Sequence, residues 1–136
     1  MLLQKAEIVP VRTDQDLVRA RHAAREAAAR LGFSLVDQTK IVTAASELAR
    51  NTIIHGKGGT MTIDVLREAA RVGLQMVFED RGPGIVDLEL ALKDGYTTGK
   101  GLGLGLSGSK RLMCEFEVTS RVGEGTRVRV VRWKHT

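Results

Sequence analysis

DRGPGIVDLELALKDGYTTGKGLGLGL, residues 80–106, combines an acidic turn with two groups of glycines. The acidic turn carries Gly82 and Gly84 and directly follows an apolar run at residues 72–78, which predicts a buried strand. Glycine has no Cβ, so the backbone at the end of this strand is open to close approach by a ligand. We therefore expect a binding site where this strand ends.

The second group of glycines leads into an expected helix over residues 107–115. The segment before it, DGYTTG at residues 94–99, has the small, polar composition of a mobile lid. A helix N-terminus presents unpaired amides and the positive end of the helix dipole, and both attract anions. Gly101, Gly103 and Gly105 therefore predict a phosphate or nucleotide site.

The composition predicts one compact cytoplasmic domain over residues 1–136. A hydrophobic content of 43% is enough for a packed core, and no apolar run approaches the roughly 20 residues that cross a bilayer. The charged beginning of the chain lacks the apolar stretch of a signal peptide. Cys114 is the only cysteine, which excludes an intrachain disulfide, and we expect it to be a buried small hydrophobe.

The net charge of +5 favours an acidic partner and raises the question of nucleic-acid binding. Two of the basic residues near the C-terminus, Arg127 and Arg129, alternate with Val128 and Val130, as on the solvated face of a strand. Aromatic residues make up only 4% of the chain, too few for an evident base-stacking surface. We therefore expect neither a nucleic acid nor a membrane as a partner.

Two helices are expected in the first half of the chain. The first begins at a cap formed by Thr13 or Asp14 and ends at Gly32. The second opens with the S-x-x-D pattern of a capping box at residues 34–37 and continues to about residue 54.

Three polar residues of the second helix, Thr43, Glu47 and Asn51, follow one another at intervals of four. This spacing places them on one line, beside the apolar stripe of the helix and at the border of the core. Alone, such a line is typical of a polar helix edge. The glycines downstream favour a functional role.

The remaining segments predict strands. The strand over residues 5–12 contains a proline, which confines it to a sheet edge or shortens it. Residues 61–65 pair with the strand that ends at Asp80, and residues 118–122 pair with 126–133, each pair as an antiparallel hairpin. Early helices and later hairpins indicate an α+β fold, a two-layer α/β sandwich with helices on one face of a mixed, mostly antiparallel sheet.

The glycines match two other nucleotide motifs only in part. Gly103, Gly105 and Gly108 fit G-x-G-x-x-G, but that fingerprint follows a strand, and here a polar loop precedes it. A P-loop needs Gly-Lys-Ser/Thr, whereas the Gly-Lys pair at residues 99–100 is followed by Gly101. Both motifs are therefore rejected.

Four short stretches, taken in order, resemble the ATP-binding motifs of the GHKL superfamily, which includes gyrase, histidine kinases and MutL. They are E-x-x-x-N at residues 47–51, D-x-G-x-G at 80–84, G-x-G-x-G at 101–105, and Gly125 with Thr126. Within that superfamily, SELARN at 46–51 and DGYTTGKGLGLGLSGSKRLMCEF at 94–116 resemble the stressosome switch kinases, relatives of the anti-sigma serine kinases. The resemblance runs nearly end to end and implies the Bergerat ATP-binding fold.

The resemblance implies a role for each matching residue in binding ATP with Mg²⁺. The Asp80 carboxylate would accept a hydrogen bond from the adenine amino group, and Thr126 would join that contact. Gly82 and Gly84 would let the backbone approach the base. The amide oxygen of Asn51 would hold Mg²⁺ against the phosphates.

The resemblance also implies a catalytic role for Glu47, one helical turn from Asn51, as the base that takes the proton from the attacking hydroxyl. The glycine-rich segment would stabilise the phosphate charge through its backbone amides, with Lys100 adding a cation. The residues of this segment are Lys100, Gly101, Leu102, Gly103, Leu104 and Gly105.

The implied function is that of a protein serine/threonine kinase of the partner-switching type. Such a kinase phosphorylates STAS-domain antagonists and, once released, activates a phosphatase. A self-phosphorylating histidine kinase is disfavoured because the chain has no H-[ED]-x-x-x-P box. Two alternatives stay open: an anti-sigma factor, with a sigma factor as the less favoured partner, and a nucleotide-dependent scaffold that transfers no phosphate.

Overall fold

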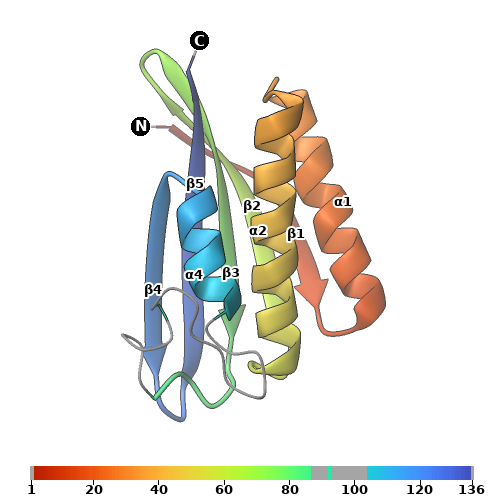
Figure 1. Ribbon diagram of the computed structural model, residues 1–136, viewed down its shortest axis with the longest axis vertical. Helices are drawn as coiled ribbons and strands as arrows, with labels where there is room; N and C mark the ends of the chain where they lie inside the picture. Colours follow the sequence, from red (N-terminus) through yellow and green to blue (C-terminus); the bar gives the residue numbers. More distant parts are fainter. Residues whose placement is uncertain (1, 87–91, 93–103, 136) are drawn as a thin grey trace.

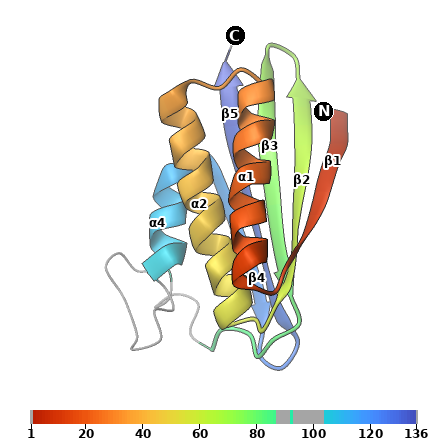
Figure 2. The ribbon, with the colours of Figure 1, turned by 90° about the vertical axis from the view of Figure 1, so that its right-hand side faces the viewer.

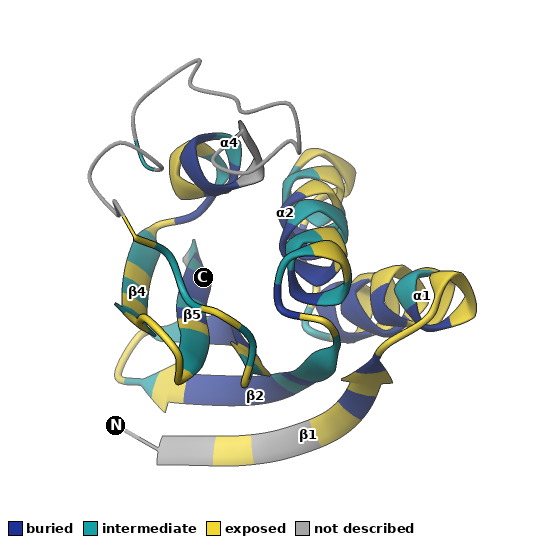
Figure 3. Cartoon of the chain, turned by 90° about the horizontal axis from the view of Figure 1, so that it is seen from below, coloured by how far each residue is buried: buried dark blue, intermediate teal, exposed yellow. Residues whose placement is uncertain are grey.

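The computed structural model describes residues 2–86, 92 and 104–135, which form two layers (Figure 1). The strands are β1 (Leu2–Val11), β2 (Gly59–Glu68), β3 (Arg71–Asp80), β4 (Glu115–Arg121) and β5 (Gly125–His135). They form one sheet in the order β1-β2-β3-β5-β4. The described helices are α1 (Asp14–Arg30), α2 (Leu35–Ile54) and α4 (Leu104–Leu112), and all three lie on one face of the sheet (Figures 2 and 3).

The predicted α+β sandwich is confirmed, and every described pair of neighbouring strands is antiparallel. β1 occupies an edge of the sheet, as its proline predicted, and pairs with β2 from Leu2 onward. β5 inserts between β3 and β4, so the end of β3 at Asp80 lies opposite Thr126 near the start of β5. Among the described helices, none is long and apolar enough to span a membrane.

The first helix begins at the predicted cap. Thr13 is the N-cap, and its hydroxyl accepts a hydrogen bond of 3.1 Å from the Asp16 amide. The Asp16 carboxylate in turn accepts the amides of Arg12 and Thr13, which completes a capping box. These bonds, led by that from the Arg12 amide, lower the pKa of Asp16 below its ordinary value of 3.8.

The second helix forms only half of its predicted capping box. The hydroxyl of the N-cap, Ser34, accepts the Asp37 amide at 3.1 Å. The Asp37 carboxylate instead forms a 2.9 Å ion pair with Arg132 of β5. Arg132 also donates to the carbonyl of Leu112 at 2.8 Å, so this side chain ties both α2 and the end of α4 to the sheet.

The core lies between the helices and the sheet. α1 packs against α2, and many of the buried residues of both helices are alanines, whose small side chains let packed elements approach closely. They include Ala20, Ala24, Ala27 and Ala28 of α1 and Ala44, Ala45 and Ala49 of α2. Larger residues fill the space above the sheet, and burying each contributes about 1.5–3 kcal/mol. They include Ile41, Leu48, Met61, Ile63, Leu74, Met76, Phe78 and Val130.

The helix before β4 differs from its prediction. α4 begins and ends earlier than the expected residues 107–115. The amide of Cys114 donates a 2.8 Å hydrogen bond to the carbonyl of Val131, and Glu115 is the cross-strand partner of Val131. Cys114 and Glu115 therefore bond to or pair with β5, although the local sequence pattern predicted a helix there. Cys114 is exposed, so its expected burial was wrong.

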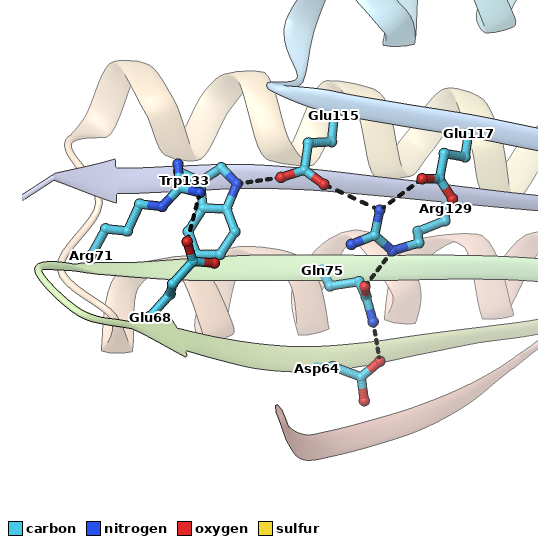
Figure 4. Close-up of polar contacts among 8 residues, drawn as sticks. All are labelled: Asp64, Glu68, Arg71, Gln75, Glu115, Glu117, Arg129 and Trp133. Atoms are coloured by element: carbon cyan, nitrogen blue, oxygen red, sulfur yellow. Dashed lines mark hydrogen bonds and ion pairs between the residues drawn. The ribbon is translucent and has the colours of Figure 1, made fainter. Parts of the chain in front are cut away.

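The face of the sheet away from the helices carries a smaller apolar cluster of Leu66, Val131 and Trp133. The Trp133 ring lies over Gly73, where a Cβ would come within 2.7 Å of it. The Arg71 guanidinium stacks 3.8 Å from the ring centroid, and the indole N–H donates to Glu115 at 2.6 Å (Figure 4). Trp133 is thus a buried anchor that lies outside the main core.

Candidate functional site

A cavity of about 690 Å³ opens at the end of the molecule where α2 and β3 stop and β5 starts, at the bottom of Figure 1. Its volume lies in the usual range for small-molecule sites, and its lining combines apolar walls with few polar groups. The apolar walls include Leu48, Phe78, Ile85, Leu106 and Val128. The polar side chains include Asn51, Asp80 and Thr126, three residues that the sequence predicted for nucleotide binding.

Asp80 is held in one orientation by the backbone around it. Its Oδ1 accepts hydrogen bonds from the amides of Gly82 at 2.9 Å and Thr126 at 3.2 Å. Its Oδ2 accepts none from any residue that the structure describes. The side chain therefore offers one remaining acceptor atom at the cavity wall.

The two glycines after Asp80 are required for different reasons. Gly84 has φ +79°, a conformation that favours glycine, and a Cβ there would lie 2.4 Å from the carbonyl oxygen of Arg121. A Cβ on Gly82 would lie 2.7 Å from the carbonyl oxygen of Gly56. The turn after β3 is thus in close contact with backbone at both glycines, which leaves no room for a Cβ at either position.

Ser120 of β4, which the sequence did not single out, fixes this turn to Thr126. Its hydroxyl accepts the Ile85 amide at 2.8 Å and lies 2.8 Å from the Thr126 hydroxyl. No local motif marks Ser120, because its partners come from two other segments. His55 and Lys57 also line the cavity and were not among the predicted site residues, although they directly follow α2.

Asn51 presents an unsatisfied amide at the cavity. Its Nδ2 is buried and has no hydrogen-bond partner among the described residues. A buried polar group without a partner is costly, which fits a side chain that meets a ligand. Among the described residues, no three or more acidic, histidine or cysteine side chains are grouped so that they could hold a metal ion. A magnesium ion here would therefore take its other oxygen ligands from phosphates and water.

Glu47 does not line this cavity. It borders a separate hollow of about 520 Å³ between α1 and α2, together with Arg21, His22 and Arg25. The Glu47 side chain is 38% exposed, and its carboxylate lies 3.9 Å from the Arg50 guanidinium. The predicted line of Thr43, Glu47 and Asn51 is thus divided, because its first two members border the hollow and Asn51 borders the cavity.

The glycine-rich segment is only partly within the described residues. Leu104 and Gly105 form the first turn of α4, whose Leu106 reaches the cavity wall. Lys100, Gly101, Leu102 and Gly103 lie outside the described residues, as does the expected lid at residues 94–99. Their predicted roles stay predictions.

The sequence matches the Histidine kinase-like ATPase domain family over residues 9–132. It is 44% identical over 125 residues to "Serine/threonine-protein kinase RsbT" of Bacillus subtilis, covering 92% of this chain and 94% of that protein. It is 33% identical over 120 residues to the "Anti-sigma F factor" of a Thermoanaerobacter species, covering 84% of this chain and 82% of that protein.

Two solved structures share the fold at low sequence identity. The RsbU and RsbW domains of a Mycobacterium tuberculosis protein superpose with a TM-score of 0.61 and 21% identity, over 93% of this chain and 32% of that one. The mycobacterial sensor histidine kinase MprB superposes with a TM-score of 0.56 and 16% identity, over 96% of this chain and 99% of that one.

Proposed function

The chain belongs to the family of histidine kinase-like ATPase domains, in the group that includes the RsbT kinase and the anti-sigma F factors, and we propose that it is a partner-switching kinase. It is a protein serine/threonine kinase that uses ATP. Its substrates are STAS-domain antagonist proteins, and after release from them it activates a phosphatase. The 44% identity to RsbT, over 92% of the chain, supports this choice.

The observation that carries the proposal is the single unused acceptor of Asp80 at the wall of an otherwise mostly apolar cavity. An adenine ring would lie between apolar side chains such as Phe78 and Ile85, with its amino group donating to Oδ2 of Asp80. Guanine carries a carbonyl oxygen at that position, so the carboxylate would face a second acceptor. Asp80 thereby selects adenine.

At the other wall, the Asn51 amide would hold Mg²⁺ through its oxygen. Bound Mg-ATP supplies the phosphoryl group that is transferred to a substrate hydroxyl. Lys100 and the backbone amides at Gly101 to Gly105 would bind the phosphates, and the amides of the first turn of α4 belong to that set.

Glu47 would act as the general base. It lies on α2 one helical turn before Asn51, yet outside the cavity lining, in a hollow that opens between α1 and α2. A carboxylate in this position can be reached by a hydroxyl of another protein while a nucleotide occupies the cavity. The basic residues Arg21 and Arg25 beside it would favour an acidic substrate surface.

An anti-sigma factor is the second candidate, favoured by the 33% identity to anti-sigma F factors. The two candidates share a kinase activity but differ in the partner that binds most tightly. Binding of the purified protein to a STAS-domain protein and to a sigma factor from the same organism would separate them. Tighter binding to the sigma factor would favour the second candidate.

Phosphotransfer tests the proposal directly. The protein is incubated with γ-labelled Mg-ATP and a STAS-domain protein from the same organism, and the labelled product is treated with acid. A serine or threonine phosphoester survives acid, whereas a phosphohistidine does not. We expect an acid-stable label on the STAS-domain protein. An acid-labile label, or none on any STAS-domain protein of that organism, would contradict the proposed substrate.

A further inference from the structure

Gly56, the second residue after α2, is in direct contact with the Asp80 carboxylate. A Cβ built on Gly56 would lie 2.3 Å from both Cγ and Oδ2 of Asp80 and 2.6 Å from its Cβ. These distances are far shorter than any real contact between a Cβ and a non-bonded carbon or oxygen atom. Gly56 is not among the glycines with positive φ, so its backbone conformation is open to any residue. Space, and not backbone conformation, makes glycine necessary here.

Neither partner can move aside at low cost. Gly56 is tied to the end of α2 through its amide, which donates to the carbonyl of Asn51 at 3.1 Å. The Asp80 carboxylate is tied through Oδ1 to the amides of Gly82 and Thr126. Turning the carboxylate away from a Cβ at position 56 would break both bonds. It would also redirect Oδ2, which has no hydrogen-bond partner among the described residues, on a side chain that lines the cavity.

We propose that Gly56 is a positioning residue for base selection. By leaving empty the space that a Cβ would fill, it allows Asp80 to hold Oδ2 where an exocyclic amino group of a purine can donate to it. The class of ligand that depends on Gly56 is therefore the 6-aminopurine nucleotides. The inference rests on the proposed role of Asp80 in reading adenine, and it adds a determinant from the segment after α2.

The test compares Mg-ATP with the magnesium complex of purine riboside triphosphate, which lacks only the 6-amino group. Calorimetry gives both affinities for the native protein, for Gly56→Ala and for the control Gly108→Ala. A Cβ on Gly108 meets nothing within 4 Å, and alanine suits its helical position in α4. We expect the native protein and the control to prefer ATP by about tenfold or more. Gly56→Ala should bind the two nucleotides nearly equally.

The outcomes separate this inference from the function on which it rests. If the native protein does not distinguish the two nucleotides, Asp80 does not read the amino group and the proposed role of Asp80 fails. If the native protein prefers ATP and Gly56→Ala keeps the full preference, the role of Asp80 stands and the positioning role of Gly56 is overturned. A general loss of folding would lower the apparent affinity for both nucleotides together, and thermal unfolding then decides between the two explanations.

A second measurement decides the matter if Gly56→Ala does not fold well enough to bind. The Asp80→Gly background removes every Asp80 atom that the new Cβ would meet. We expect Gly56→Ala to lower the thermal unfolding temperature of the native protein strongly and that of Asp80→Gly only slightly. An equal decrease in both backgrounds would show that the new Cβ disturbs something other than Asp80, and the inference would fail.

Discussion

The main-chain amide of Thr126 donates a 3.2 Å hydrogen bond to Oδ1 of Asp80, although 46 positions separate the two residues in sequence. They are cross-strand partners at the adjoining ends of β3 and β5. Together with the Gly82 amide, this bond occupies one carboxylate oxygen and leaves the other for a ligand. The selectivity that we propose for the cavity therefore depends on sheet pairing as much as on the carboxylate itself.

Asp80→Asn should reverse the preference for the base. The amide oxygen can replace Oδ1 and keep both backbone bonds, which places the amide nitrogen at the position of Oδ2. A donor would then face the adenine amino group, and the affinity for Mg-ATP should fall about 10- to 100-fold. Calorimetry with Mg-ATP and Mg-GTP measures this change.

The neighbouring Glu79→Gln, outside the cavity lining, serves as the control and should behave like the native protein. Equal native affinities for the two nucleotides would refute the assignment.

Asn51→Ala should remove the magnesium dependence of nucleotide binding without destabilising the free protein greatly. The Asn51 amide nitrogen has no partner among the described residues, so its loss breaks no hydrogen bond that this part of the structure contains. Titration of ATP binding against Mg²⁺ and thermal unfolding of the free protein test the two halves of this prediction. Thr43→Ala, earlier on the same helix line, is the matched control. A variant that still requires Mg²⁺ for tight binding would show that another residue holds the ion.

Glu47→Gln should leave the affinity for ATP unchanged and slow phosphotransfer by about 10²- to 10⁴-fold, the usual contribution of a positioned general base. Glu47 lies outside the cavity lining and is partly exposed, so neither nucleotide binding nor folding should suffer. Single-turnover transfer to the protein substrate, measured beside calorimetry with Mg-ATP, gives both quantities. Glu7→Gln on β1 is the control. Transfer at the native rate would show that Glu47 is not the general base.

Glu115→Gln should reduce the acid sensitivity of the fold. The indole N–H of Trp133, followed by the Arg129 guanidinium, lowers the pKa of Glu115 below its ordinary value of 4.5 (Figure 4). A carboxylate whose pKa is lower in the folded state stabilises the fold fully above pH 4.5 and loses this contribution as the pH falls through the folded-state pKa.

Thermal unfolding at neutral pH and at several values below pH 4.5 tests the role of Glu115. The native unfolding temperature should fall more steeply with acid than that of Glu115→Gln. Trp133→Phe, which removes the indole donor but keeps a ring over Gly73, should also flatten the pH dependence. Identical profiles for the native protein and Glu115→Gln would show that this carboxylate does not contribute.

Local sequence signals predicted most of the secondary structure. The caps at Thr13 and Ser34 act over three residues, so the starts of α1 and α2 could be read directly. The two hairpins follow from alternating apolar residues and nearby turn residues, which are equally local. The end of α4 could not be predicted in this way. Cys114 bonds to Val131, which the helical pattern of its own neighbours does not reveal.

The sequence by itself identified the residues that we propose for the chemistry, because carboxylates, amides and glycines in a fixed order are a property of the chain alone. Only the tertiary structure decided how these residues are distributed between the cavity and the hollow beside it. It left one oxygen of Asp80 unused, placed Asn51 at the cavity and Glu47 at a separate hollow, and made Gly56 part of the site. The arrangement around Asp80 depends on backbone from two distant segments, at Thr126 and Gly56, and local propensities do not encode such contacts.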